Sequence, residues 1–359
     1  MCVCVCVRRR YALTWLWSTL FASKRASDLR VAAAGRSRSG VEASVAKACK
    51  HFKPVVVLAD VADERSVYLM VARTRVVINC VGPYMQFGEP VVKACASLGV
   101  DYVDITGEQY WGEAMRVKYH DVALRSGARI IPFCGHDSVP ADLTAWFTLS
   151  QISAEELLQS HAALIVCAKV TGRGVSNGTF KTLLELVTAP EQAKLEPEGK
   201  FDGQARIAAG VQLVDDVPAS HGGPLAVLPT EMASDAYVVR LQHARKPEYK
   251  AGRLEIVNAL VMPNRPAAYA VQGALAAAPY VVRVLAPVLR RLSSSGMGPS
   301  QPTAGPQTPY AMFGVLRLYP LKGSVHEEPL ERVVTRVDVD RVRRPPPFPC
   351  FVFVLYIKN

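Results

Sequence analysis

The sequence predicts an α/β fold in which a doubly wound parallel sheet is followed by a second, α+β domain. The first observation behind this prediction is length, because 359 residues exceed the usual size of a single domain. The second is a regular alternation of β-branched apolar runs with helical segments, which begins near Leu29. Strands that alternate with helices of this length indicate parallel strands joined by crossover helices.

Each predicted element rests on a local signal. The runs PVVVLAD and VVINCVGPY are continuous and β-branched, which is typical of strands buried on both faces. Helix signals include Pro90 near one helix start and Gly99 as the C-cap of the same helix. We expect Val57, Val77 and Ile131 to be buried. The predicted strands are Leu29–Gly35, Val55–Leu58, Val76–Val81, Val100–Ile105 and Ile130–Phe133. The predicted helices are 39–50, 61–73, 89–99, 110–126 and 140–149.

Polar or glycine-containing segments follow these strands directly. They are AGRS at 34–37, Asp60, NCVGPY at 79–84, DITGE at 104–108 and CGHDSVP at 134–140. One such segment is an ordinary turn, whereas five in series predict the lip of a cleft, because ligands bind at the carboxyl ends of parallel strands. Simpler interpretations exist for some residues. Asp137 or Ser138 can cap the next helix, Glu108 can begin a helix, and His136 is a lone loop histidine.

The segment NCVGPYMQFGEPVVKACASLGVDYVDITGE, followed by GHDSVPADL, resembles the saccharopine dehydrogenase-like oxidoreductases, a family that includes trans-acting enoyl reductases. The resemblance is specific from Ala34 to Trp146 and weaker to about Gly305. It implies a Rossmann-like NAD(P)-binding domain with NADP as the cofactor. It also implies an NADP-dependent oxidoreductase of lipid or glycolipid metabolism, acting on a lipid-like or other small-molecule substrate.

The resemblance implies roles for individual residues. Arg36 and Ser37 would meet the adenosine 2′-phosphate, since an arginine after the second strand selects NADP. Asp60 would lie near the adenine. Tyr84 is the candidate catalytic residue, as a proton donor or a substrate contact. Taken alone, AGRS is better interpreted as an ordinary turn with a surface arginine, whereas in series with NCVGPY the functional interpretation is favoured. The residues implied on the nicotinamide side are Asn79, Gly82, Pro83 and Tyr84.

The chain departs from the family pattern at the first cofactor contact. The family begins with a strand and a glycine-rich turn resembling GATGFTG, whose backbone approaches the pyrophosphate. In this chain the first glycine is Gly35, which already follows the second strand. Either MCVCVCV replaces the first strand or the sheet is incomplete, and neither supplies the turn. We therefore expect weak or absent NADPH binding. The alternative function is a non-catalytic membrane- or lipid-droplet-associated protein, or an inactive fragment.

The two ends differ in composition from the middle. Residues 1–27 open with Cys-Val alternation, which a translated TG repeat also encodes, so a gene-model artefact is the first interpretation, a transit peptide the second and a signal peptide the third. We assign 28–150 to the Rossmann-like domain, 151–330 to the α+β domain and 331–359 to an atypical tail. Residues 1–27 and 335–359 are expected to pack poorly against the first sheet.

Charge and cysteine content argue against two classes of function. The formal net charge is +11, but most of it lies in residues 1–30 and 331–359, so no basic stripe indicates nucleic-acid binding. None of the nine cysteines has Cys-x-x-Cys spacing, and we expect no metal site. Four central cysteines are expected to be small buried hydrophobes. They are Cys80, Cys95, Cys134 and Cys167.

The second domain gives fewer signals. HAALIVCAKVT is expected to be a strand, NGTFKTLLELVTAP a helix capped by Asn177, and GRLEIVNALVMP an extended segment. The longest apolar stretch, 267–289, contains Arg283 and two prolines. We expect a buried or membrane-surface helix pair there rather than a membrane span. The protein is expected to be intracellular, with a lipid droplet, a membrane surface or a mitochondrion as alternative locations.

Overall fold

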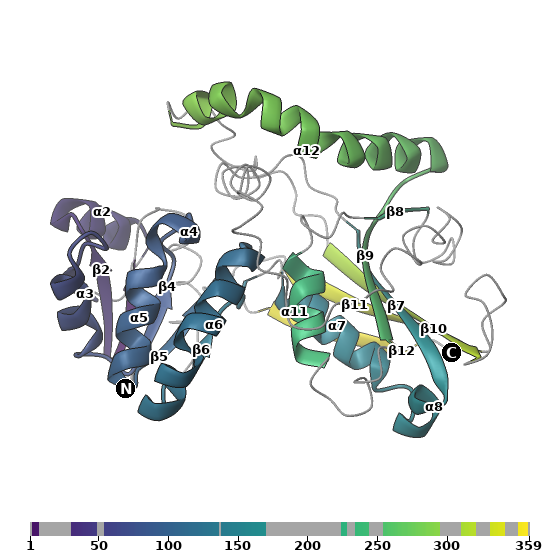
Figure 1. The fold of residues 1–359 in the computed structure, drawn as a ribbon, viewed down its shortest axis with the longest axis horizontal. Helices are drawn as coiled ribbons and strands as arrows, with labels where there is room; N and C mark the ends of the chain where they lie inside the picture. The colour runs from purple at the N-terminus through teal and green to yellow at the C-terminus, as the bar shows by residue number, and fades with distance from the viewer. Residues whose placement is uncertain are drawn as a thin grey trace. The chain divides into compact units, whose positions relative to one another are not determined.

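A computed structural model describes residues 2–6, 30–48, 54–135, 138–169, 224–227, 234–243, 254–294, 310–320, 331–341 and 351–357. The chain divides into two compact units, whose main segments are Met1–His136 and Asp137–Arg341. Each unit is built on its own six-stranded sheet (Figure 1).

The sheet of the first unit has the strand order β3-β2-β1-β4-β5-β6. All of its neighbouring strands pair in parallel. This order, with the first strand in the centre, is that of a dinucleotide-binding Rossmann fold, so the predicted α/β class is confirmed. The strands are β1 Cys2–Cys6, β2 Arg30–Gly35, β3 Val55–Leu58, β4 Val76–Asn79, β5 Asp101–Asp104 and β6 Ile130–Ile131.

The alternating Cys-Val segment occupies the centre of this sheet. Cys4 of β1 lies opposite Ala32 of β2 on one side and opposite Val77 of β4 on the other. Cysteine and valine suit a strand, because small and β-branched apolar side chains fit a pleated surface. The expectation that residues 1–27 pack poorly against the sheet is therefore wrong for Cys2–Cys6. The pairing fits the alternative in which this stretch replaces the first strand, whereas the gene-model and transit-peptide interpretations stay predictions.

Helices of the first unit pack against its sheet, with α5 between α3 and α6 (Figure 1). The start of α3 is capped by Asp63, whose carboxylate accepts a hydrogen bond from the N–H of Ser66. The predicted C-cap Gly99 ends α5 with φ 68°, a left-handed conformation that glycine adopts without strain. The helices are α2 Arg38–Ala48, α3 Glu64–Val71, α4 Tyr84–Phe87, α5 Glu89–Leu98 and α6 Gln109–Ser126.

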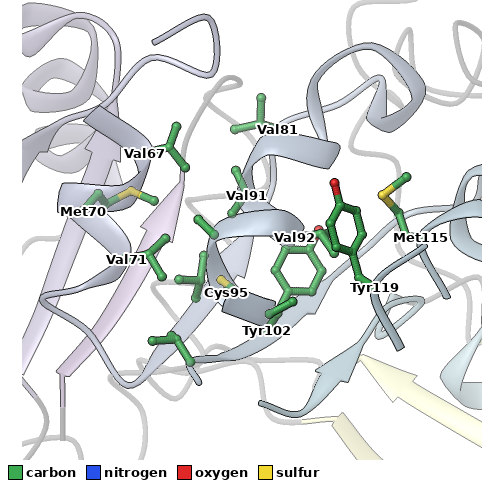
Figure 2. Packing of buried hydrophobic residues seen from close by; sticks show 14 of the residues in the cluster. Val67, Met70, Val71, Val81, Val91, Val92, Cys95, Tyr102, Met115 and Tyr119 are labelled. Atoms are coloured by element: carbon green, nitrogen blue, oxygen red, sulfur yellow. The ribbon is translucent and has the colours of Figure 1, made fainter. Parts of the chain in front are cut away.

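The core of the first unit lies between these helices and the sheet. Val67 and Val71 from α3, Val91 and Cys95 from α5, and Tyr102 from β5 are buried in one cluster (Figure 2). Each fully buried valine of this kind stabilises the fold by about 1.5–3 kcal/mol. The cluster fixes the helices relative to the strands, and with them the strand ends at which ligands bind in such sheets.

The two edge strands are less buried than the sequence predicts. Val77 of β4 is fully buried, as expected, but Val57 of β3 is only half-buried. Ile131 of β6 is 50% exposed and Val55 of β3 is 64% exposed, so burial on both faces is wrong for these strands. Both strands lie at an edge of the sheet, where fewer neighbouring elements cover them. A continuous apolar run therefore predicts a strand here but does not place it in the sheet.

The second unit has a mixed sheet with the strand order β12-β11-β10-β7-β9-β8. The pair β7–β9 is parallel, whereas β10 is antiparallel to both β7 and β11, and β8 is antiparallel to β9. The strands are β7 Ser160–Lys169, β8 Leu225–Val227, β9 Leu254–Val261, β10 Tyr310–Pro320, β11 Glu331–Arg341 and β12 Phe351–Ile357. The helices are α7 Val139–Leu149, α8 Ala154–Leu158, α11 Ser234–His243 and α12 Arg265–Ser294.

Both predicted boundaries of the second domain are wrong. The helix α7 belongs to the second unit rather than to a first domain ending at 150, because Ala145 and Leu149 pack in one cluster with Leu164 of β7. Within the segment predicted to be a tail, the described residues 331–341 and 351–357 form strands, since β11 pairs along β10 and β12 continues the sheet. The strands expected near residues 161 and 254 are confirmed as β7 and β9.

The long apolar stretch forms one continuous helix, α12, of 30 residues (Figure 1). The expected helix pair is therefore wrong, because neither Pro279 nor Pro287 ends the helix. Among the helices that the structure describes, none is long and apolar enough to cross a membrane. The helix expected from Asn177 lies outside the described residues.

Candidate functional site

A pocket of about 460 Å³ lies at the carboxyl ends of β2 and β3 in the first unit. Gly35, Arg36 and Ser37 line it after β2, and Asp60 lines it after β3. The N–H of Ala59 donates to the carbonyl of Gly35 at 3.1 Å, which joins the two strand exits. The pocket therefore lies where a Rossmann sheet binds the adenosine part of a dinucleotide.

The turn between β2 and α2 presents an arginine at this pocket. Arg36 is exposed, and within the described residues it has no hydrogen bond or ion pair, whereas the neighbouring Arg38 lies 3.6 Å from Glu42. Ser37 closes the first turn of α2, since its hydroxyl accepts a hydrogen bond from the N–H of Gly40 at 3.3 Å. A guanidinium beside the start of a helix is a suitable environment for a phosphate.

Asp60 shapes the opposite wall of the pocket. Its carboxylate accepts a hydrogen bond from the N–H of Ala62 at 3.1 Å. Its own N–H donates to the hydroxyl of Ser66 at 3.0 Å, and that hydroxyl is the donor to the carbonyl of Asp63 at 2.8 Å. These bonds hold Asp60 in a tight turn, half-buried, with its carboxylate beside the pocket.

A buried hydrogen-bonded network lies at the ends of β4 and β5. The amide of Asn79 donates to the hydroxyl of Tyr102 at 3.1 Å, and this hydroxyl donates to the carboxylate of Asp104 at 2.7 Å. The other carboxylate oxygen of Asp104 accepts hydrogen bonds from the N–H groups of Thr106 and Phe133, each at 3.0 Å. Asn79, Tyr102 and Asp104 are all fully buried. The network therefore joins the ends of β4, β5 and β6 rather than facing solvent.

Burial dominates the electrostatics of this network. It raises the pKa of Asp104 from 3.8 to about 6, although the hydrogen bonds from Thr106, Tyr102 and Phe133 oppose the shift. Burial also raises the pKa of Tyr102 well above its ordinary value, and the negative charge of Asp104 adds to this effect. The tyrosine therefore stays protonated and acts as a fixed hydrogen-bond donor.

Tyr84 and Glu108 connect this network to α4. The hydroxyl of Tyr84 donates to the carbonyl of Asn79 at 2.8 Å, and its ring packs on Trp111 with the centroids 5.2 Å apart. The carboxylate of Glu108 accepts hydrogen bonds from the N–H of Tyr84 at 2.9 Å and of Met85 at 2.7 Å. Glu108 is fully buried, so a negative charge is held at the start of α4.

Comparison with known proteins identifies the first unit. Residues 18–131 match the family model described as "Saccharopine dehydrogenase NADP binding domain". This part of the chain is therefore similar to the NADP-binding domain of the saccharopine dehydrogenase family. The match begins inside the segment 1–27, which was predicted to be atypical. It includes the whole pocket, from Ala34 to Val91.

Curated relatives match less than half of the chain. The "Saccharopine dehydrogenase-like oxidoreductase" of Homo sapiens is 36% identical over 168 residues, which are 45% of this chain and 39% of that protein. The "Putative trans-acting enoyl reductase Rv2449c" of Mycobacterium tuberculosis is 34% identical over 174 residues, or 47% of this chain and 40% of the relative. The "Lipid droplet localized protein" of Caenorhabditis elegans is 40% identical over 129 residues, which are 36% of this chain and 30% of that protein. The matched region thus spans about two fifths of the length of the first two relatives and less of the third.

Among solved structures, apo saccharopine dehydrogenase (L-Glu forming) from Saccharomyces cerevisiae is similar at 10% identity. The TM-score is 0.48, and the alignment covers 94% of this chain and 84% of that one. The assignment to the family rests on the matched sequence and on the strand order of the first sheet, not on this similarity.

Three of the predicted cofactor residues meet in the pocket and three do not. Arg36, Ser37 and Asp60 line it together. Asn79 is fully buried and its amide is engaged inside the protein, so its predicted nicotinamide contact has no support in the geometry. Gly82 and Pro83 form the turn that leads into α4 and lie outside the pocket lining.

The geometry also gives no support to Tyr84 as a proton donor. Its ring is buried, and its hydroxyl donates to a backbone carbonyl. Burial raises its pKa well above the ordinary value, and the charge of Asp104 adds to the shift. A structural role in fixing the strand end fits this geometry better. His136 and Asp137 lie outside the described residues, and Ser138 at the start of α7 makes no side-chain cap.

Sequence reasoning missed the wall that α4 and its neighbours contribute to the pocket. Gln86 and Phe87 of α4 line it together with Val81. A partial signal was present in the sequence, because Gln86 lies two residues after the NCVGPY segment. Glu108 does stand at the start of a helix as expected, since it is the N-cap residue of α6, but its carboxylate makes no cap there and accepts backbone N–H groups of α4, more than 20 residues earlier in the chain.

The cysteines and the metal-ligand set offer no second site in the described part of the chain. Cys95 and Cys167 are buried as expected, Cys80 is half-buried, and Cys134 is exposed, contrary to expectation. Burial raises the pKa of Cys80 to about 12 and that of Cys134 to about 11, with Asp104 adding to both shifts, so these thiols are protonated at neutral pH. No group of three or more metal-ligating side chains gathers in the ranges described.

Proposed function

We propose that the first unit binds NADP through the 2′-phosphate of its adenosine half, and that the protein is an oxidoreductase acting on a lipid-like substrate. The observation that carries the cofactor proposal is Arg36, which is exposed and unpaired in the described residues at the exit of β2. Rossmann domains that prefer NAD place an acidic side chain near this position to bind the ribose 2′-hydroxyl, whereas an arginine accommodates the 2′-phosphate. Ser37 supplies a hydroxyl beside it.

The residues present fit the adenosine half of the cofactor. The pocket combines a guanidinium, the start of α2 and an apolar wall that includes Phe87. Asp60 lies on the opposite side, near the position proposed for the adenine. The diphosphate half has no such support, because the sequence has no glycine before Gly35 and so no counterpart of the family's glycine-rich turn. NADP, when bound, supplies the hydride chemistry of the family.

The proposed substrate class rests on relatives. A putative trans-acting enoyl reductase and a lipid-droplet-localized protein are among the proteins that match part of this chain. A plant relative is described as probable mitochondrial, so a lipid droplet and a mitochondrion are both proposed locations. We propose glycolipid or lipid metabolism as the setting of the reaction. The described part of the second unit shows no feature that selects among lipid substrates.

The experiment measures binding of adenosine 2′-monophosphate, which tests the adenosine half by itself. We expect Arg36→Ala to weaken binding by about 10- to 150-fold, because a charge-assisted contact contributes about 1.5–3 kcal/mol. Arg38→Ala is the matched control, since Arg38 is an exposed arginine two residues away that lies near Glu42 outside the pocket lining. Equal loss in both variants, or none in either, would contradict the assignment of Arg36.

A second candidate function follows from the missing glycines. A non-catalytic member of the family, or an inactive fragment, would keep the adenosine pocket. The diphosphate and nicotinamide parts of the cofactor would then add no binding affinity. In that case NADPH should bind no more tightly than adenosine 2′-monophosphate, with a dissociation constant above about 1 μM. An NADPH affinity at least tenfold tighter than that of the mononucleotide would show that the diphosphate is recognised and would favour the enzyme.

A further inference from the structure

The helix α12 exposes an apolar face along most of its length. Its 30 residues correspond to a helix about 45 Å long. Val284 is 79% exposed and Tyr280 is 73% exposed, and Tyr269, Val281 and Val288 are also exposed. Such a set is unusual for a soluble surface, where large apolar side chains occur singly rather than in a contiguous patch.

These five residues share one side of the helix. At 100° per residue, they fall within an arc of about 120° centred on Val284. Ala270, Gly273 and Ala277 lie in the same arc and are exposed too, so no charged residue interrupts it from 269 to 288. We call this surface the apolar stripe. The opposite side of the helix faces the protein, since Ala268 and Ala286 are buried there.

The charge of α12 has a single sign. Residues 265–294 contain four arginines and no aspartate or glutamate. Arg265 and Arg291 stand near the two ends of the helix. A helix with an apolar stripe, whose charged residues are all cationic, suits a membrane surface, because the acyl chains are apolar and the headgroups above them are anionic.

We propose that α12 lies in the plane of a membrane surface and binds anionic phospholipids, with the apolar stripe inserted among the acyl chains. The two tyrosines suit the boundary between headgroups and acyl chains, because their rings are apolar and their hydroxyls polar. A second copy of this chain is a poorer occupant of the stripe, since pairing two α12 helices would bring eight arginines together without a carboxylate from either helix.

This inference is independent of the proposed cofactor site, because all of its residues belong to the second unit. It assigns a partner surface to the protein whether or not the first unit is catalytic. A negative result in the nucleotide titration therefore leaves the lipid proposal standing, and a negative result in the lipid experiment leaves the cofactor proposal standing.

The test is co-sedimentation of the full chain with vesicles of phosphatidylcholine alone or with about 30% phosphatidylserine. We expect binding to the mixed vesicles to be about tenfold or more tighter than to phosphatidylcholine, and to weaken at about 0.5 M salt. The double variant Val284→Asp/Val288→Asp should lose about tenfold or more of this binding, because it places two carboxylates in the stripe. Both side chains are exposed, so the fold should tolerate the changes.

The matched control is Leu124→Asp, which places the same charge at a 73% exposed leucine on α6 of the first unit. This variant should bind the mixed vesicles within about fivefold of the unchanged protein, since one added charge contributes about 1 kcal/mol at most. Circular dichroism and the melting temperature of each variant establish that it is folded. Equal binding to both vesicle types, or unchanged binding by the double variant, would overturn the proposal. Self-association that the double variant abolishes, without vesicle binding, would show that the stripe joins two copies of this chain instead.

Discussion

Glu108 is expected to affect both the stability of the first unit and the shape of its pocket. Its buried carboxylate accepts the N–H groups of Tyr84 and Met85 at the start of α4. The next residues of α4, Gln86 and Phe87, line the pocket. Replacing Glu108 with glutamine keeps the size of the side chain but removes its charge. We therefore expect this substitution to loosen α4 and to weaken nucleotide binding.

The magnitude follows from the two hydrogen bonds. The amide of Glu108→Gln retains one acceptor oxygen and turns its NH₂ group toward the other backbone N–H. One charge-assisted bond, worth about 1.5–3 kcal/mol, is lost, and the N–H left without an acceptor costs about 1–3 kcal/mol more. Removing a negative charge near Asp104 offsets part of this loss, because that charge helps to raise the pKa of Asp104. The net expected destabilisation is about 2–4 kcal/mol.

Urea unfolding followed by fluorescence measures the effect, since Trp111 packs directly against Tyr84. The midpoint should fall while the slope with urea stays constant, because the surface exposed on unfolding is unchanged. Asp63→Asn is the control, as Asp63 also accepts a backbone N–H at a helix start but is exposed. It should cost about 0.5 kcal/mol or less. A loss at Glu108 no larger than at Asp63 would refute the argument that the buried charge organises α4.

Two further predictions concern the same unit. Because the folded-state pKa of Asp104 is raised from 3.8 to about 6, the folded protein binds more protons than the unfolded chain between these values. Its stability should therefore fall as the pH rises through this window, by about 3 kcal/mol, and Asp104→Asn should remove that fall in chemical unfolding measured from pH 4 to pH 7. Gly99→Ala should destabilise more than Gly127→Ala in thermal unfolding. Both glycines have positive φ, but an added Cβ at Gly99 would lie 2.7 Å from the carbonyl oxygen of Ser126, whereas that at Gly127 meets nothing within 4 Å. Equal losses would show that backbone strain alone sets the cost.

The sequence predicts the elements of the first unit well because their signals are local. The run VVVL marks β3, and Gly99, which follows the apolar run of α5, ends that helix as a C-cap should. Asp63 and Glu64 open α3 as predicted. Each of these signals depends only on residues that are close together in the sequence. They therefore do not depend on how the rest of the chain folds.

The place of each strand in its sheet is not a local property. The run at β3 has the composition of a central strand but lies at an edge, with Val55 exposed. The Cys-Val segment has the composition of a low-complexity end but lies at the centre. Sheet position depends on pairing between residues far apart in the chain, such as Cys4 with Val77. A single sequence gives the alternation of apolar residues but not their partner strand.

The candidate site divides in the same way. Arg36 and Ser37 could be predicted, because a residue one step beyond a strand end must lie at the edge of the sheet. The role of Asn79 could not, since its side chain turns inward to Tyr102, a partner 23 residues away on the next strand. The role of Tyr84 could not be predicted either, since its hydroxyl donates a hydrogen bond to the carbonyl of Asn79 in β4. Polar residues at a strand end can support the site from within as readily as they can contact a ligand.

The central strand and the missing glycine together separate two requirements that the Rossmann fold normally combines. The sheet requires an apolar strand at its centre, and Cys2–Cys6 meets this requirement by pairing with both β2 and β4. Phosphate binding requires a backbone that can approach the ligand closely after that strand, which depends on glycine. No glycine occurs before Gly35. Folding of the sheet is therefore no evidence of dinucleotide binding in this chain. The affinity difference between NADPH and adenosine 2′-monophosphate measures what the folded sheet alone cannot show.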